Sequence, residues 1–248
     1  MEIEKRVFIV TGASSGIGLA TARALSDHGG KVALLARSTG VLQELADQLP
    51  GSLPITADMT RFEDVREAIK TVYRHYGRID GLVNNAGRSY ATTVEQIDAT
   101  LFDEIFHLNV LGPIVAMQSV IPLMRSQAEG SIVNINSGTA FMTIPGYSVY
   151  SSSKRALMGF SLAARAELER DHIVVSEIYP DRTATNFGKN RLAKSDDGGP
   201  NADYTDGTKP EVVADLVVKA VQEGHSQYFV SDRVARLAGI AAKGGGGN

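Results

Sequence analysis

Two side chains that can move a proton lie four residues apart in the stretch Y-S-S-S-K, namely Tyr150 and Lys154. On a helix this spacing places both on one face. A tyrosine phenol has an unperturbed pKa of about 10, so it works as an acid or base near neutral pH when a cation stabilises the phenolate. The pair alone is a weak signal because both residue types are common. The position of the pair relative to the other motifs therefore decides whether it indicates a catalytic site.

A glycine-rich stretch, T-G-A-S-S-G-I-G, begins at Thr11, after an apolar run and before a segment of helical period. Gly12 can take the positive φ of a tight turn, Gly16 lets backbone N–H groups approach a pyrophosphate, and Gly18 lets the helix pack close to a sheet. The positive end of the helix dipole then faces the phosphates. The spacing differs from the commoner G-x-G-x-x-G, and it predicts a dinucleotide site. The other candidate contacts in this turn are Ser14, Ser15 and Ile17.

Short, uniformly apolar runs alternate along the chain with longer segments of helical period. The expected strands are 7–12, 31–37, 53–58, 80–87, 131–138, 173–180 and 227–231. The expected helices are 18–28, 41–49, 62–76, 100–125, 148–170 and 210–223. Such strands are typical of a parallel sheet covered on both faces. We therefore expect an α/β, Rossmann-type doubly wound sheet of about seven strands, with its ligand crevice at the carboxyl ends of the strands.

The chain contains no linker or composition shift that divides it. Residues 1–242 are expected to form a single dinucleotide-binding and catalytic domain. The polar segment 186–209 is long for a plain connection and is interpreted as a lid over the substrate. The glycine-rich residues 243–248 are interpreted as a flexible tail.

Composition excludes several classes of function. The 248 residues include no cysteine, which rules out a disulfide scaffold, a thiol nucleophile and thiolate metal sites, and no metal site is expected. A formal charge of −3 without a basic tract argues against nucleic acid as a partner. No apolar stretch approaches the roughly 20 residues of a membrane helix and no signal peptide begins the chain, so a cytoplasmic protein is expected.

The motifs occur in an order that resembles the short-chain dehydrogenase/reductase family. The glycine turn is followed by N-N-A-G at 84–87, by N-S-G containing Ser137 and by the Tyr150–Lys154 pair, and the resemblance covers about 7–223. It implies an oxidoreductase that interconverts a ketone or aldehyde and an alcohol by hydride transfer. Tyr150 would be the general acid/base, Lys154 would stabilise the phenolate and bind the nicotinamide ribose, and Ser137 would polarise the substrate oxygen.

A fourth catalytic residue follows from the same resemblance. Asn109, in L-N-V-L-G-P, matches the family position that interrupts its helix locally and holds a water between the lysine and solvent. Gly112 and Pro113 just downstream are consistent with an irregular helix. Each of these four residues also has a purely structural interpretation, but four matches in order favour the catalytic one.

The second expected strand ends in A-R-S and carries no acid. In dinucleotide folds an acid at this point binds the ribose 2′-hydroxyl of NAD, whereas an arginine accommodates the 2′-phosphate of NADP. Arg37 has the fork geometry for phosphate, and Ser38 lies beside it. NADP(H) is therefore the predicted cofactor, and the alternative is that Arg37 is only a solvated charge and NAD is used.

Further cofactor contacts come from the resemblance. Asp58 would bind the adenine amino group, with Met59 against the ring, although Asp58 could instead cap the next helix. The family's nicotinamide contacts fall on Asn85, Ala86, Gly87, Pro180, Thr183 and Thr185. The chain departs from the family where Asp181 replaces the usual glycine after Pro180, and it lacks the usual C-terminal V-D-G-G.

Candidates for the substrate pocket come mainly from the loop 138–147. Arg88, Phe141 and Tyr147 are candidates for the substrate pocket, together with Met142 and Ile144, and they favour a mainly apolar small carbonyl or alcohol compound. A homo-oligomer is expected, with the 100–125 and 148–170 helices as a possible dimer interface. The alternative function is a catalytically silent NADP(H)-binding sensor of the same fold. An epimerase or dehydratase is disfavoured by the short chain and the glycine spacing.

Overall fold

The computed structural model describes residues 1–188, 191–192 and 206–239. Within them seven parallel strands form one sheet in the order β3-β2-β1-β4-β5-β6-β7, which confirms the predicted fold class. The strands are β1 Val7–Thr11, β2 Lys31–Ala36, β3 Leu53–Thr56, β4 Gly81–Asn84, β5 Gly130–Ile135, β6 Ile173–Tyr179 and β7 Gln227–Phe229. The expected tail 243–248 and most of the expected lid segment 186–209 lie outside the described residues.

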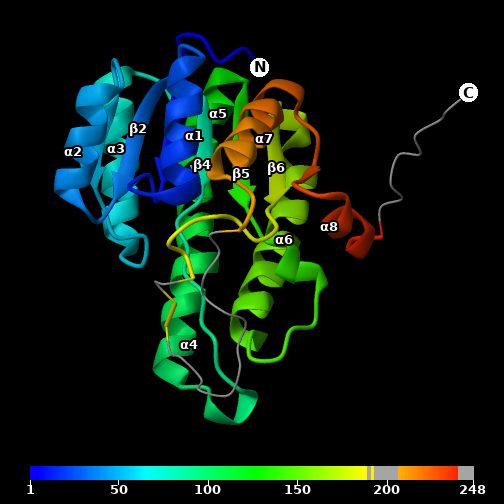
Figure 1. The fold of residues 1–248 in the computed structure, drawn as a ribbon. Helices are drawn as coiled ribbons and strands as arrows, with labels where there is room; N and C mark the ends of the chain where they lie inside the picture. The colour runs from blue at the N-terminus through cyan, green and yellow to red at the C-terminus, as the bar shows by residue number, and fades with distance from the viewer. Residues whose placement is uncertain (189–190, 193–205, 240–248) are drawn as a thin grey trace, which may run out of the picture.

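Helices surround the sheet on both faces (Figure 1). They are α1 Gly16–Asp27, α2 Thr39–Gln48, α3 Phe62–Tyr76, α4 Ala99–Phe106, α5 Gly112–Gln127, α6 Ser148–Leu168, α7 Pro210–Glu223 and α8 Asp232–Leu237. Short turns of 3₁₀ helix are η1 Val94–Gln96, η3 Gly138–Phe141 and η4 Glu169–Asp171, and η2 His107–Leu111 is a π-helix.

The strands are mainly apolar because both faces of the sheet are covered. In β1, Phe8 belongs to the apolar cluster beneath α1, α2 and α7, whereas Ile9 belongs to the cluster beneath α3, α5 and α6. β1 pairs with β2 on one side and β4 on the other, so the strand order reverses there. A crevice for a ligand is expected where the order reverses, at the carboxyl end of β1.

The helix predicted at 100–125 is interrupted. α4, η2 and α5 follow one another without a break from Ala99 to Gln127, with a π turn in the middle that contains Asn109. In the part of the chain that the structure describes, this 29-residue stretch is the one helix long and apolar enough to cross a membrane, by length and composition. Half of its most apolar window is buried, and core helices pass the same test, so it is weak evidence for a span.

Asp80 is a buried carboxylate just before β4, at the amino ends of the strands. It accepts hydrogen bonds from Arg6 Nη1 (2.9 Å), from the Val7 backbone N–H (2.8 Å) and from Arg78 Nε (2.8 Å). Burial alone would raise the pKa of Asp80, but the hydrogen bonds from Arg78, Val7 and Arg6 hold it below its ordinary value. The carboxylate therefore links the start of β1 to the residue that precedes β4.

Asp80→Asn should lower the free energy of unfolding at neutral pH by about 2–4 kcal/mol, because two arginines lose their buried partner. The folded pKa lies below the unfolded value, so this stabilisation is present above about pH 4 and disappears as the pH falls through the folded pKa. Urea unfolding of the wild type and the variant at neutral pH and below about pH 4 measures this difference in the free energy of unfolding. Asp171→Asn, which breaks a surface pair with Arg125, is the matched control and should change little. Equal effects of the two substitutions would contradict this interpretation.

Candidate active site

A cavity of about 770 Å³ lies at the carboxyl ends of the strands. The segments that follow β1 to β6 all contribute to its walls. The sequence-predicted residues that line it are Gly12, Ser14, Ser15, Gly16, Ile17, Arg37, Ser38, Asp58, Met59, Asn85, Ala86, Gly87, Arg88, Ser137, Met142, Ile144, Tyr147, Tyr150, Lys154, Pro180, Thr183 and Thr185. The fold thus brings together residues that lie up to about 170 positions apart in the sequence.

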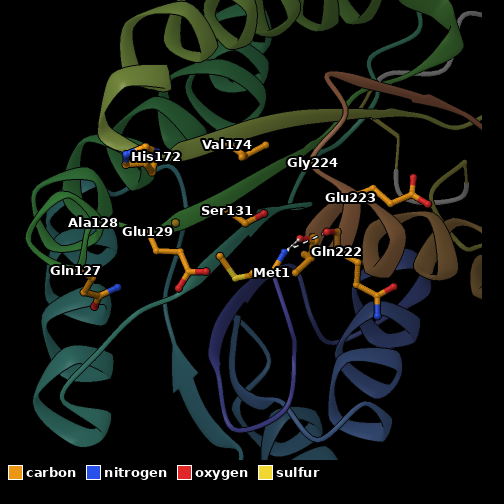
Figure 2. A pocket seen from close by; sticks show the side chains of 12 residues that line it. Met1, Gln127, Ala128, Glu129, Ser131, His172, Val174, Gln222, Glu223 and Gly224 are labelled. Atoms are coloured by element: carbon orange, nitrogen blue, oxygen red, sulfur yellow. Dashed lines mark hydrogen bonds between the residues drawn. The ribbon is translucent and has the colours of Figure 1, made fainter.

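A smaller hollow of about 470 Å³ lies at the opposite ends of β5 and β6 (Figure 2). Ser131, His172 and Gln127 contribute to it, and the Met1 amino group donates to the Val221 and Gln222 carbonyls beside it. It shares no lining residue with the larger cavity. The residues predicted to do chemistry therefore belong to the larger one.

The glycine turn has the conformation that the sequence predicts. Gly12 and Gly16 have φ values of +66° and +54°. A Cβ on Gly18 would lie 2.3 Å from the Gly12 carbonyl oxygen, so Gly18 packs within the turn and does not line the cavity. The first turn of α1 carries no acid, and the side chain of its N-cap, Ser15, makes no capping hydrogen bond. An uncapped helix N-terminus at a glycine turn suits a pyrophosphate group.

Charged residues line the cavity where β2 and β3 end. Arg37 follows β2 and Asp58 follows β3. Burial raises the pKa of Asp58, but hydrogen bonds from the Thr60 N–H and hydroxyl, both to Oδ1, and the charge of Arg37 bring it below its ordinary value. The N-cap of α3 is Arg61, so Asp58 forms a turn with Thr60 and does not cap the helix.

Ser137, Tyr150 and Lys154 meet on one wall of the cavity. Ser137 follows β5, and its hydroxyl accepts from the Thr139 N–H (3.2 Å) and interacts with the Tyr150 phenol. Lys154, one helical turn after Tyr150 on α6, donates from Nζ to the Ile135 carbonyl (2.9 Å). Its Nζ lies 6.0 Å from the centre of the Tyr150 ring.

Burial dominates the protonation of this pair. It raises the pKa of Tyr150 to about 12, although the hydrogen bond with Ser137 opposes the shift. Burial also lowers the pKa of Lys154 to about 8, against the charge of Glu177. The structure therefore differs from the sequence expectation of a tyrosine pKa depressed by lysine. Tyr150 is a phenol at neutral pH, and Lys154 is an ammonium directed at a backbone carbonyl.

Asn109 is fully buried in the π-helix and lies behind the cavity wall. Its Nδ2 donates to the Arg88 carbonyl (2.9 Å) and to Ser153 Oγ (3.1 Å), while its Oδ1 accepts from the Arg88 N–H (3.0 Å). A Cβ on Gly87 would lie 3.1 Å from Asn109 Oδ1 and 3.8 Å from Lys154 Nζ. Asn109 thus fixes the segment after β4 against α6, beside the lysine.

The structure differs from the prediction at Phe141. Its ring packs against Tyr179 (4.8 Å between centroids) and Phe229 (6.2 Å) and does not line the cavity. The aromatic wall comes instead from Phe187, whose ring centre lies 5.7 Å from that of Tyr150. Asn186 and Phe187 belong to the predicted lid segment, and the lining residues outside the segments predicted to form the site include Val41, Glu104, Leu108, Asn136 and Arg233. In the sequence, Phe187 is recognisable as an aromatic residue in a polar segment.

Asp181, at the position where a glycine was expected, has no positive φ. Its Oδ1 accepts from the Arg182 N–H (2.9 Å), and its Oδ2 accepts from the Ser231 hydroxyl (3.1 Å). The Thr183 hydroxyl donates to its carbonyl (3.0 Å). Because Ser231 is the N-cap of α8, Asp181 connects the end of β6 to the start of that helix.

The strand order and the glycine turn at its reversal point define a doubly wound, Rossmann-like α/β protein. A family model described as short chain dehydrogenase matches residues 6–196. The chain therefore belongs to the short-chain dehydrogenase/reductase family, and it is an oxidoreductase.

Individual relatives agree with this family. Dehydrogenase/reductase SDR family member 7B of Xenopus tropicalis is 31% identical over 248 residues, covering 95% of this chain and 80% of its own. An alcohol dehydrogenase from Thermococcus sibiricus, solved with 5-hydroxy-NADP, has a TM-score of 0.80 at 26% identity and covers 91% of this chain and 96% of its own. A short chain dehydrogenase/reductase from Burkholderia phymatum, solved with NAD, has a TM-score of 0.87 at 21% identity, covers 96% and 93%, and shows the shared fold.

Proposed function

We propose that the protein is an NADP(H)-dependent oxidoreductase that interconverts a ketone or aldehyde and an alcohol. One observation carries this proposal. A single cavity joins the uncapped helix N-terminus at the glycine turn, with Arg37 at one end, to the Ser137–Tyr150–Lys154 wall at the other. A dinucleotide bound along such a cavity supplies the hydride.

The residues present suit this cofactor. The α1 N-terminus and its glycines would hold the pyrophosphate, and Arg37 with Ser38 would hold the 2′-phosphate. Asp58 keeps Oδ2 clear of the turn with Thr60 and would bind the adenine amino group. Asn85, Ala86, Gly87, Pro180, Thr183 and Thr185 would surround the nicotinamide and its ribose.

The chain's own residues would then manage the proton. The Ser137 hydroxyl would hold the carbonyl oxygen, and the Tyr150 phenol would donate its proton to the developing alkoxide. Lys154 would stabilise the resulting phenolate, since it remains an ammonium at neutral pH. Asn109 would hold the Arg88 segment beside Lys154 and, as the resemblance implies, a water that links the lysine to solvent.

An apolar carbonyl compound is the proposed substrate class. Phe187, Tyr147 and Ile144 form an apolar cluster with Tyr150. Arg88 lines the cavity but pairs with Glu104 (3.1 Å), which favours a neutral substrate over an anionic one. The segments η2 and α6 expose Leu111, Phe160 and Leu162, which supports the proposal of a homo-oligomer.

A panel of ketones and aldehydes assayed with NADPH and with NADH tests the proposal. Oxidation of NADPH that depends on an apolar carbonyl compound is the expected result. Tight NADPH binding without turnover across the panel would favour the alternative, a sensor protein of the same fold.

The pH dependence of carbonyl reduction follows from the two shifted groups. The active state needs the Tyr150 phenol, which keeps its proton far above neutrality, and the Lys154 ammonium, which loses its proton near pH 8. We expect kcat/KM to be highest below about pH 8 and to fall as the pH rises through that value. A rate that stays constant from about pH 7 to pH 10 would contradict the assignment of Lys154.

A further inference from the structure

A buried acid lies directly behind the Ser137–Lys154 wall. Glu177, on β6, is 1% exposed. Its Oε1 accepts a hydrogen bond from Asn136 Nδ2 (2.8 Å), and its Oε2 accepts one from the Tyr179 phenol. Asn136 immediately precedes Ser137, so Asn136 links the Glu177 carboxyl group to the residue whose hydroxyl is proposed to bind the substrate.

The directions of the hydrogen bonds show which protonation state of Glu177 the neighbouring groups favour. Gln227 Nε2 donates to the Tyr179 oxygen (3.2 Å), so the phenol proton is directed at Glu177. Asn136 Oδ1 accepts from the Ser137 N–H (2.9 Å), so its amide nitrogen is the atom directed at Glu177. Both carboxyl oxygens therefore face donors, and an acceptor-only carboxylate is the form that satisfies both.

A buried carboxylate needs a positive partner. Burial raises the pKa of Glu177 above its ordinary value and lowers the pKa of Lys154 to about 8, while the charge of each residue opposes the shift of the other. The link is also structural, because Asn136 Nδ2 donates to the Lys154 carbonyl (3.2 Å) and Lys154 Nζ bonds to Ile135, the residue before Asn136.

We propose that Glu177 is a positioning residue of the active site, which holds Ser137 through Asn136 and supplies the counter-charge that keeps Lys154 an ammonium. This inference rests on the proposed function. Titratable groups around the network come from α6 and β6 behind the wall and from the segments after β4 and β6 on the cavity side. Among the described residues they include Tyr150, Lys154, Tyr179, Arg88, Asp181 and Arg182, together with Arg165, which donates to the Val175 carbonyl of β6, and Arg233, which lines the cavity. Of these, Lys154 is the buried cation.

The pH profile of kcat/KM separates this role from a packing role. In Glu177→Gln the amide keeps the shape but removes the charge, so Lys154 should lose its proton at lower pH. We expect the alkaline limb to move down by about one pH unit. Glu177→Asp keeps the charge and should keep the limb near its wild-type position. Asp80→Asn, a buried carboxylate at the other end of the sheet, is the control and should leave the limb in place.

A double-mutant cycle tests the pairing without cofactor or turnover. Glu177→Gln and Lys154→Met each leave one buried charge unpaired, whereas the double variant leaves none. The measurement is urea unfolding of the ligand-free protein. We expect the folding equilibrium constant of the double variant to be about tenfold larger than additive effects of the two single substitutions predict. If Glu177→Gln alone does not fold, adding Lys154→Met should restore folding.

Additive effects in the cycle, a double variant that stays unfolded, or an alkaline limb unmoved in Glu177→Gln would overturn the proposal. Because the cycle measures only folding, it can fail while carbonyl reduction by the wild type stands. Conversely, a wild type without turnover would overturn the proposed function and leave the charge pairing to be judged from the cycle.

Discussion

Tyr150→Phe should lower kcat for carbonyl reduction by about a thousandfold, while the Kd for NADPH changes by no more than about twofold. The substitution removes the proton donor and leaves the ring. The phenyl group can still pack against Phe187, and the glycine turn and Arg37 are untouched. Steady-state kinetics and titration of NADPH fluorescence measure the two quantities separately.

Tyr147→Phe is the matched control. Tyr147 is also a buried tyrosine of the same cavity, with its ring centre 6.2 Å from that of Tyr150. It has no lysine four residues later, since position 151 is Ser151. The control should keep kcat within about tenfold of wild type. Near-normal turnover in Tyr150→Phe, or equal losses in both variants, would contradict the assigned role.

Arg37→Asp should lower the ratio of kcat/KM for NADPH to that for NADH by about 10²- to 10³-fold. The guanidinium that would pair with the 2′-phosphate is lost, and the new carboxylate repels the phosphate and can accept from a ribose hydroxyl. Turnover with NADH should survive, because the substitution is remote from Ser137 and Tyr150.

Arg61→Asp is the control for a general change of charge. Arg61 also acts on the Asp58 carboxylate, but it is the N-cap of α3 and does not line the cavity. It should change the coenzyme ratio by less than about tenfold. A wild type that prefers NADH, or an Arg37→Asp ratio close to wild type, would contradict the NADP(H) proposal.

The sheet could be predicted because its strands obey a simple pattern. β1 is apolar from Val7 to Val10 because neighbouring residues such as Phe8 and Ile9 are buried on opposite faces. α3 begins and ends at the predicted residues, because acids occupy its first turn and Gly77, with φ +74°, ends it. The π turn at Asn109 is indicated by the resemblance to the family and by Gly112 and Pro113 just downstream, and not by the apolar pattern of the helix around it.

The loops and the interior network could not be predicted in the same way. Phe141 and Phe187 are both aromatic residues in loops, and only the course of the backbone decides that Phe187 faces Tyr150. Glu177 interrupts an apolar strand, but nothing in the sequence indicates that its partners are Asn136 and Tyr179. The resemblance to the family located the candidate catalytic residues, whereas the protonation of Tyr150 and Lys154 depends on burial.

The central claim is that this chain transfers a hydride between NADPH and a carbonyl carbon. Incubation of the protein with NADPH deuterated at both C4 positions and a reducible ketone from the panel tests it directly, with the alcohol analysed by mass spectrometry. We predict one deuterium on the carbinol carbon of the alcohol, and none in a parallel incubation with Tyr150→Phe. An alcohol without deuterium, or no alcohol from any ketone or aldehyde of the panel, would contradict the account.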